Sequence, residues 1–175
     1  TDIKTGELSL LKNVPTKPFF FISEAECYFL QADAVLRAGG NAKTMYDLGV
    51  VTALNQYKIK TSADFVAVDG AYEFPSAGSF DEKLEAIIQQ KWVALFQGTN
   101  STEAYIEHVR TGYPTESELP YGDENGYVYG QFTYPVNGVT AGKYPKRLPA
   151  SKDENQNNQN ADDLVDAFQP VWWNK

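Results

Sequence analysis

The chain has 175 residues, of which 42% are hydrophobic and 14% aromatic, enough to bury the core of about one domain. The formal net charge of -8 argues against a nucleic-acid partner, because a surface that follows phosphates needs clustered Lys and Arg. The longest apolar run, residues 18–22, is far shorter than the ~20 residues that cross a bilayer, and the single cysteine excludes an intramolecular disulfide.

The first helix signal is a capping box made by Ser23 and Glu26. The Ser23 hydroxyl can accept from the backbone N–H of Glu26 while the Glu26 carboxylate reaches back to the N–H of Ser23. The helix predicted over residues 24–38 ends at Gly39, because a residue without Cβ takes the left-handed conformation easily. Apolar and small residues lie on more than one side of this helix, so we expect it to have neighbours on two faces.

A second helix is predicted over residues 42–57, with Asn41 as its cap, because apolar residues recur there at helical spacing. The first two helices would form an αα-hairpin. Residues 60–78 contain Gly, Pro, Ser and Asp among short apolar pairs, which predicts an irregular connection.

A second capping box, Ser79 with Glu82, opens the most regular helix pattern of the chain. Its apolar stripe includes one lysine and consists of Leu84, Ile87, Ile88, Lys91, Trp92 and Leu95. Gly98 would end this helix. A fourth helix would begin after Asn100 and end near Gly112.

Helical periodicity stops at Tyr113, and six of the eleven tyrosines fall within residues 113–144, which we call the Tyr-rich segment. Residues 127–134 could form a short hairpin, and a stretch this long without regular structure is usually functional or an interface. Residues 151–163 are polar and low in complexity, and predict a solvated loop. The pair Trp172 and Trp173 predicts a docked C-terminal tail.

Five blocks of the sequence resemble, in the same order, successive C-terminal elements of SusD/RagB proteins. They are Phe21–Arg37, Phe80–Phe96, Glu103–Pro114, Gly142–Leu148 and Val171–Trp173. The blocks are spread over most of the chain after residue 18, and their order is more specific than any single block.

The resemblance implies a mainly α fold, built from irregular tetratricopeptide-like helix pairs with long embellishing loops. Residues 1–175 would be the C-terminal part of a SusD-like domain, with helical pairs in residues 19–112. Tyr-rich loops and a docked tail would occupy residues 113–175. The N-terminal portion of such a protein would be missing from this chain.

The same resemblance implies a nutrient-capturing lipoprotein on the cell-surface side of the outer membrane. Its partners would be an oligosaccharide or polysaccharide, a TonB-dependent transporter of the SusC type, and the N-terminal portion that carries the lipid. Cys27 cannot be the lipidated residue, because it lies inside the first predicted helix.

Sugar capture needs aromatic faces for the C–H groups of the ring, with amide or carboxylate groups for its hydroxyls. The residues that meet these needs best are Tyr127, Tyr129, Tyr134, Asn125 and Gln131. In the competing interpretation, these tyrosines pack the segment against the helices.

An enzyme is the least favoured class. His108 is the only histidine, and we expect it to be packed or at the surface rather than a base or ligand. No nucleophile-elbow, phosphate-loop or zinc-protease motif occurs, so we predict no catalytic residue, metal or cofactor. Residues 153–163 could offer oxygen ligands to Ca²⁺ but lack the order of an EF-hand loop.

Two further interpretations concern the loops. The basic group at residues 143–147, followed by Asp153 and Glu154, predicts an electrostatic tie between two loop arms. The alternative function is a helical-repeat module that binds only protein, with the Tyr-rich segment as its interface and no glycan binding of its own.

Overall fold

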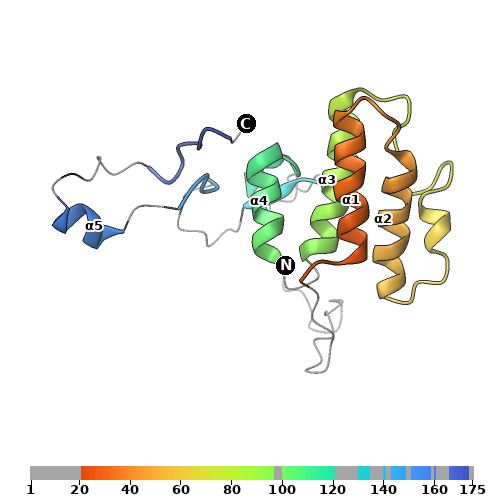
Figure 1. The fold of residues 1–175 in the computed structure, drawn as a ribbon, viewed down its shortest axis with the longest axis horizontal. Coiled ribbons are helices and arrows are strands. Elements are labelled where there is room, and N and C mark those ends of the chain that lie inside the picture. Colours follow the sequence, from red (N-terminus) through yellow and green to blue (C-terminus); the bar gives the residue numbers. More distant parts are fainter. Residues whose placement is uncertain are drawn as a thin grey trace.

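The computed structural model describes most of the chain. The described residues are 21–96, 100–120, 130–134, 140, 143–148, 151–158, 160 and 166–173. They form a mainly helical protein, in which four longer helices pack side by side and loop segments extend beyond the last of them (Figure 1). The mainly α prediction is confirmed. No helix among the described residues is long and apolar enough to span a membrane.

The first helix, α1 (Glu24–Arg37), begins and ends as predicted. The Glu26 N–H donates to Ser23 Oγ at 3.1 Å, and the Ser23 N–H donates to Glu26 Oε2 at 3.4 Å, so both hydrogen bonds of the capping box form. Gly39 follows the helix with a φ of +77°, a conformation that costs a residue without Cβ little.

The second helix, α2 (Lys43–Gln56), completes the predicted hairpin with α1. Its N-cap residue is Ala42, one position after the residue predicted. The Asn41 side chain still supplies an acceptor, because its Oδ1 receives the N–H of Lys43 at 3.0 Å. The prediction of Asn41 as the N-cap is therefore wrong by one residue, although its side chain still accepts a hydrogen bond from the first residue of the helix.

The main core lies where α1 packs against α2 on one side and α3 (Phe80–Phe96) on the other (Figure 1). Phe29 and Ile87 are fully buried there. Gly49 of α2 lies directly against the Phe29 ring, since a Cβ at this glycine would come within 2.7 Å of Phe29 Cε1. The two-sided burial of α1 confirms the expectation of neighbours on two faces.

The connection between α2 and α3 is irregular, as predicted, and contains one 3-10 turn, η1 (Ser62–Phe65). It is held to the core by Tyr46, whose ring packs tilted against that of Phe74 at a centroid distance of 5.0 Å and whose hydroxyl donates to the Tyr72 carbonyl at 3.1 Å. The connection therefore forms one wall of the core.

The helix α3 starts at the second capping box: the Glu82 N–H donates to Ser79 Oγ at 3.2 Å, and the Ser79 N–H donates to Glu82 Oε2 at 2.6 Å. Gly98, the predicted end of this helix, lies outside the described residues. The helix α4 (Ser101–Thr111) packs on α3 and ends at Gly112, whose φ is +76°.

Two short strands follow, β1 (Glu116–Pro120) and β2 (Phe132–Tyr134). They pair in parallel, with Glu116 opposite Phe132. The predicted hairpin within residues 127–134 lies partly outside the described residues, and its described part is a strand whose partner is upstream. A hairpin pattern is local, whereas this pairing joins segments separated by a long loop.

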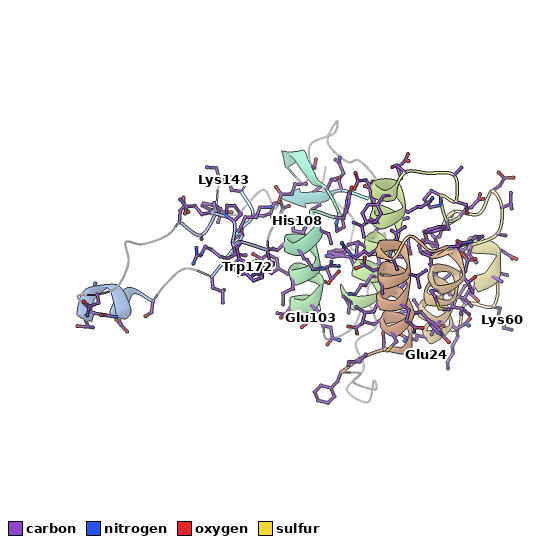
Figure 2. The ribbon with its side chains drawn as sticks, turned by 45° about the horizontal axis from the view of Figure 1, so that its top comes forward. Glu24, Lys60, Glu103, His108, Lys143 and Trp172 are labelled. Atoms are coloured by element: carbon purple, nitrogen blue, oxygen red, sulfur yellow. The ribbon has the colours of Figure 1, made fainter. Side chains whose placement is uncertain are left out.

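The C-terminal region differs from its prediction in two places. Residues predicted as a solvated loop contain a short exposed helix, α5 (Lys152–Asn157), and the Asp153 N–H donates to Ser151 Oγ at 3.3 Å at its start. Trp172, expected to help dock the tail, is 95% exposed, so its indole packs little against the described residues. Figure 2 shows Trp172 beyond α4, in the part of the molecule that also holds Lys143.

The tail is instead held by backbone hydrogen bonds to a loop. The N–H groups of Lys146 and Arg147 donate to the Ala167 carbonyl at 2.7 and 3.2 Å. The Lys143 ammonium lies 5.6 Å from the centroid of the Phe168 ring. The described contacts of the tail with residues 143–147 therefore involve Ala167 and Phe168.

Candidate functional site

The candidate site is the base of the Tyr-rich segment, where the chain leaves α4 and folds back over it. Gly112 ends the helix, and its N–H donates to the His108 carbonyl at 2.8 Å. A cis Tyr113–Pro114 peptide follows. Pro114 then presents its carbonyl to His108 Nδ1 at 2.9 Å. The start of the segment is therefore fixed on the side of α4 that carries His108.

Four aromatic side chains from four parts of the chain meet at this base, and we call them the aromatic cluster. They are Trp92 of α3, His108 of α4, Phe132 of β2 and Tyr144. The Phe132 ring is central: its centroid lies 5.0 Å from that of Trp92, 4.9 Å from that of His108 and 5.4 Å from that of Tyr144. The cluster joins the middle and the C-terminal end of the Tyr-rich segment to the helices.

Polar contacts reinforce the same junction. The Lys146 Nζ lies 2.8 Å from Glu116 Oε1, and the same oxygen lies 3.2 Å from His108 Nε2. The hydroxyl of Tyr105 on α4 donates to the Pro145 carbonyl. The predicted electrostatic tie between residues 143–147 and Asp153 is not present among the described ion pairs, because Lys146 pairs instead with Glu116 of β1. The Glu154 side chain lies outside the described residues.

His108 is 1% exposed in the described structure, and Figure 2 shows it on α4 at the junction with the loops. Burial lowers its pKa below the usual 6.5, because the charged imidazolium is poorly solvated there. Glu116 acts in the opposite direction, and Lys146 adds to the lowering. The prediction of a packed histidine is confirmed.

Next to this junction runs a chain of ion pairs, buried at Lys91 and Glu107 and partly exposed at its two arginines, which we call the ionic network. Lys91 Nζ lies 3.3 Å from Glu107 Oε1. Arg110 Nη2 lies 2.7 Å from Glu107 Oε2 and 2.9 Å from Asp33 Oδ2. Arg37 Nε closes the chain at 2.7 Å from Asp33 Oδ1. The network connects α3, α4 and α1, and so fixes α4 against the first helix pair.

The ionic network also sets the protonation of its central acid. Burial of Glu107 by itself would raise its pKa, but Arg110 and Lys91 outweigh this effect and the pKa is lowered from its usual 4.5. Arg110 has its own pKa raised, since Glu107 and Asp33 together exceed the cost of its burial. Both groups are therefore charged at neutral pH.

Comparison with known proteins identifies the fold and the family. The model of the SusD-like family described as starch-binding and associating with the outer membrane matches residues 2–135. The chain belongs to this SusD-like family. The match includes α1 to α4 and most of the Tyr-rich segment, so the sequence resemblance is confirmed.

Two solved structures resemble this SusD-like chain. A SusD homologue from Bacteroides fragilis shares 24% identity and a TM-score of 0.60, covering 90% of this chain and 35% of its own. A protein from Bacteroides vulgatus, whose description as an outer-membrane protein involved in nutrient binding is itself an inference, shares 23% identity and a TM-score of 0.60. It covers 91% of this chain and 35% of its own.

These identities show the shared fold alone, which supports the tetratricopeptide-like arrangement of the helix pairs. The SusD-like chain spans about a third of the length of either solved relative. Comparison with curated proteins found no match.

The ligand residues predicted from the sequence are placed only in part. Asn125, Tyr127 and Tyr129 lie outside the described residues. Gln131 is half-buried and immediately precedes β2, and Tyr134 is the last residue of that strand, in register with Pro120. Gln131 and Tyr134 therefore lie close to Phe132 of the aromatic cluster along the chain, while ligand binding by all five residues stays a prediction.

Sequence reasoning missed the residues that build the base of the segment. Lys91 gave a signal, because a lysine in the apolar stripe of a helix needs a buried acidic partner. Phe132, Tyr144 and Glu116 gave none, since their contacts join distant parts of the chain. Within the described ranges, no cluster of three or more His, Cys, Asp or Glu side chains could hold a metal ion.

Proposed function

We propose that this chain is the C-terminal portion of a surface protein that binds an oligomeric nutrient, a glycan, and delivers it to an outer-membrane transporter. The observation that carries the proposal is the family match over residues 2–135, because the family is described as starch-binding and all five candidate ligand residues fall within the matched range. In this proposal the helices are the scaffold and the Tyr-rich segment supplies part of the binding surface.

The geometry supports a role for the segment through preorganisation. Binding a flexible loop to a sugar costs the entropy of ordering that loop, so a loop fixed before binding retains more affinity. The aromatic cluster and the Lys146–Glu116 pair hold both ends of the segment on α4. The backbone of Tyr134, at the end of β2, and of Gln131, directly before β2, would then be held in place before a ligand binds. The face of a tyrosine ring is well suited to the C–H groups of a sugar ring.

The proposal extends to partners and place. The transporter would be TonB-dependent and of the SusC type, and the protein would lie on the cell-surface side of the outer membrane through an N-terminal lipid carried by an upstream portion of the same protein. Binding would involve no bond cleavage, so the protein would not act as an enzyme. The family description, starch-binding and associating with the outer membrane, supports the location and the ligand class.

Calorimetry of the full-length protein against starch and a panel of other polysaccharides tests the proposal. We expect saturable binding to at least one glycan, and we expect the substitutions Tyr127→Ala, Tyr129→Ala and Tyr134→Ala to weaken it. The matched control is Tyr57→Ala, because Tyr57 is 42% exposed at the end of α2, on the opposite side of α1 from α4 (Figure 1). Absence of binding to every glycan would refute the proposal.

A second candidate, a module that binds only protein, is favoured by apolar side chains on the outer faces of the helices. Leu30 of α1, Val93 of α3 and Ile106 of α4 are 46%, 41% and 38% exposed. A transporter pull-down separates the two functions. Loss of glycan affinity with an intact pull-down in the tyrosine variants supports glycan capture, and the reverse result supports the protein-binding module.

A further inference from the structure

His108 occupies a hydrogen-bonding position that a neutral imidazole cannot satisfy. Its Nδ1 lies 2.9 Å from the carbonyl oxygen of Pro114, and its Nε2 lies 3.2 Å from Glu116 Oε1. A carbonyl and an ionised carboxylate are both acceptors only. Each ring nitrogen therefore needs a proton, and a neutral imidazole carries one proton for the two nitrogens.

The alternative is that Glu116, rather than His108, carries the extra proton. The second contact of Glu116, with Lys146, argues against this alternative. Lys146 Nζ lies 2.8 Å from the same Oε1, so this oxygen already accepts a hydrogen bond from an ammonium group. The side chain of Glu116 is also 36% exposed, so water solvates its charge. The extra proton therefore belongs on the histidine whenever both contacts are made.

The groups around His108 have opposing effects on its protonation. The charged groups that act on the ring are Glu116 of β1 and Lys146 of the 143–148 segment. The rings of Phe132 and Tyr144 cover it and carry no charge at neutral pH. On α3, Lys91 is paired with Glu107. Hydrogen bonding thus favours the imidazolium, and burial favours the neutral ring.

We propose that His108 is a proton-operated clamp: its protonation closes both hydrogen bonds and holds the base of the Tyr-rich segment on α4, and loss of the proton opens the bond to Glu116 and loosens that base. This inference goes beyond the proposed function and does not depend on any ligand. The clamp therefore holds the base of the Tyr-rich segment more firmly at lower pH.

Together, these opposing effects place the pKa of His108, and with it the pH at which the clamp opens, below that of an ordinary histidine. Burial lowers the pKa of His108 below 6.5, and Lys146 lowers it further, while Glu116 partly restores it. The clamp therefore opens as the pH rises through a value below 6.5. The single histidine of the sequence makes this titration directly assignable by NMR, because only one imidazole signal exists.

The test is an NMR titration of the chain from pH 8 to pH 4 that follows two signals. The first is the His108 ring Cε1–H, which reports protonation. The second is the protection factor of the Phe132 amide, corrected for the intrinsic pH dependence of exchange, because this N–H donates to the Thr115 carbonyl at 2.7 Å within the clamped region. We expect about tenfold higher protection with His108 protonated, the size of one hydrogen bond to a charged group.

Two variants make the test specific. In Glu116→Gln, the amide N–H can donate to the neutral Nε2, so Phe132 protection should lose its pH dependence while the fold is kept. In Lys146→Met, the midpoint of His108 should rise, and the midpoint of Phe132 protection should rise with it. Equal protection in both protonation states of the unsubstituted chain, unchanged pH dependence in Glu116→Gln, or midpoints that separate in Lys146→Met would each overturn the clamp.

Discussion

The ammonium of Lys91 lies 3.3 Å from the carboxylate of Glu107, and the two side chains are only 4% and 11% exposed. This pair ties α3 to α4 inside the protein, and Arg110 extends the connection to Asp33 on α1. The position of α4, and with it the base of the Tyr-rich segment, therefore depends on charges withdrawn from water.

Replacing Lys91 with Met tests the contribution of this pair. Removing one partner of a buried pair costs roughly 3–5 kcal/mol when the other charge is left uncompensated. Because Arg110 still pairs with Glu107, we expect the free energy of unfolding to fall by about 2 kcal/mol, in the middle of the range for an unsatisfied buried polar group. Urea unfolding measures this change.

Lys83→Met is the matched control, because Lys83 lies on the same helix but is half exposed. The Lys83→Met change should stay within about 0.5 kcal/mol, as for most surface substitutions. Equal stability of the Lys91→Met variant and the unsubstituted chain would show that the ion pair contributes nothing to holding α4.

The lowered pKa of Glu107 predicts that the free energy of unfolding decreases at acidic pH. A carboxyl whose pKa is lower in the folded state than its usual 4.5 stabilises the fold when ionised. This stabilisation is complete above pH 4.5 and is lost as the pH falls through the lower, folded-state pKa. We expect the free energy of unfolding of the unsubstituted chain to decrease over that range.

The Glu107→Gln variant isolates the contribution of this carboxyl. It should be less stable than the unsubstituted chain at pH 7, and the difference should shrink as the pH falls below 4.5. Glu103→Gln, at an exposed position in the first turn of the same helix, provides the control. A stability difference for Glu107→Gln that stays constant between pH 7 and pH 3 would contradict the assignment.

The contact of Gly49 with Phe29 predicts an unusual response to alanine. In a helix interior, Gly→Ala normally adds about 1 kcal/mol through helix propensity. Here the new Cβ would lie 2.7 Å from Phe29 Cε1, and overpacking of a filled core costs about 1–3 kcal/mol. We expect Gly49→Ala to destabilise the chain by about 1 kcal/mol in urea unfolding, the difference of these two effects.

Shortening the opposing ring should relieve this clash. Phe29→Leu alone destabilises the core, but combined with Gly49→Ala it should cost less than the sum of the two single changes. Simple additivity of the two changes would mean that α1 and α2 separate at this point without cost.

Local signals account for the part of the fold that the sequence predicted. The capping boxes at Ser23 and Ser79 and the glycines at 39 and 112 act within one helix turn, so their outcome depends on near neighbours. The positions of helix ends therefore follow from a few adjacent residues.

Long-range contacts account for what the sequence did not predict. The parallel pairing of β1 with β2 joins segments on either side of residues 121–129. The partners of Phe132 in the aromatic cluster come from two helices and a later loop. Trp172 shows that the average burial of a residue type does not decide the burial of one side chain. Tryptophan is highly buried on average, but Trp172 is exposed.

Phe132→Ala tests whether the aromatic cluster holds the Tyr-rich segment independently of the main core. The ring contacts His108, Trp92 and Tyr144, whereas the core between α1, α2 and α3 does not include it. Loss of a half-buried phenyl group costs about 2 kcal/mol, less than the roughly 3–5 kcal/mol of a fully buried one. That loss raises local opening of the segment about 30-fold.

Limited digestion with trypsin measures this opening, because Lys143 and Arg147 flank Tyr144 and neither precedes a proline. We expect cleavage after Lys143 and Arg147 to accelerate by about 30-fold in Phe132→Ala, while circular dichroism of the helices changes little. Phe80→Ala is the control, because Phe80 is 43% exposed at the start of α3 and lies outside the cluster. If both variants were cleaved at the rate of the unsubstituted chain, the cluster would not be what keeps the segment on α4, and preorganisation of the predicted ligand residues would lose its physical basis.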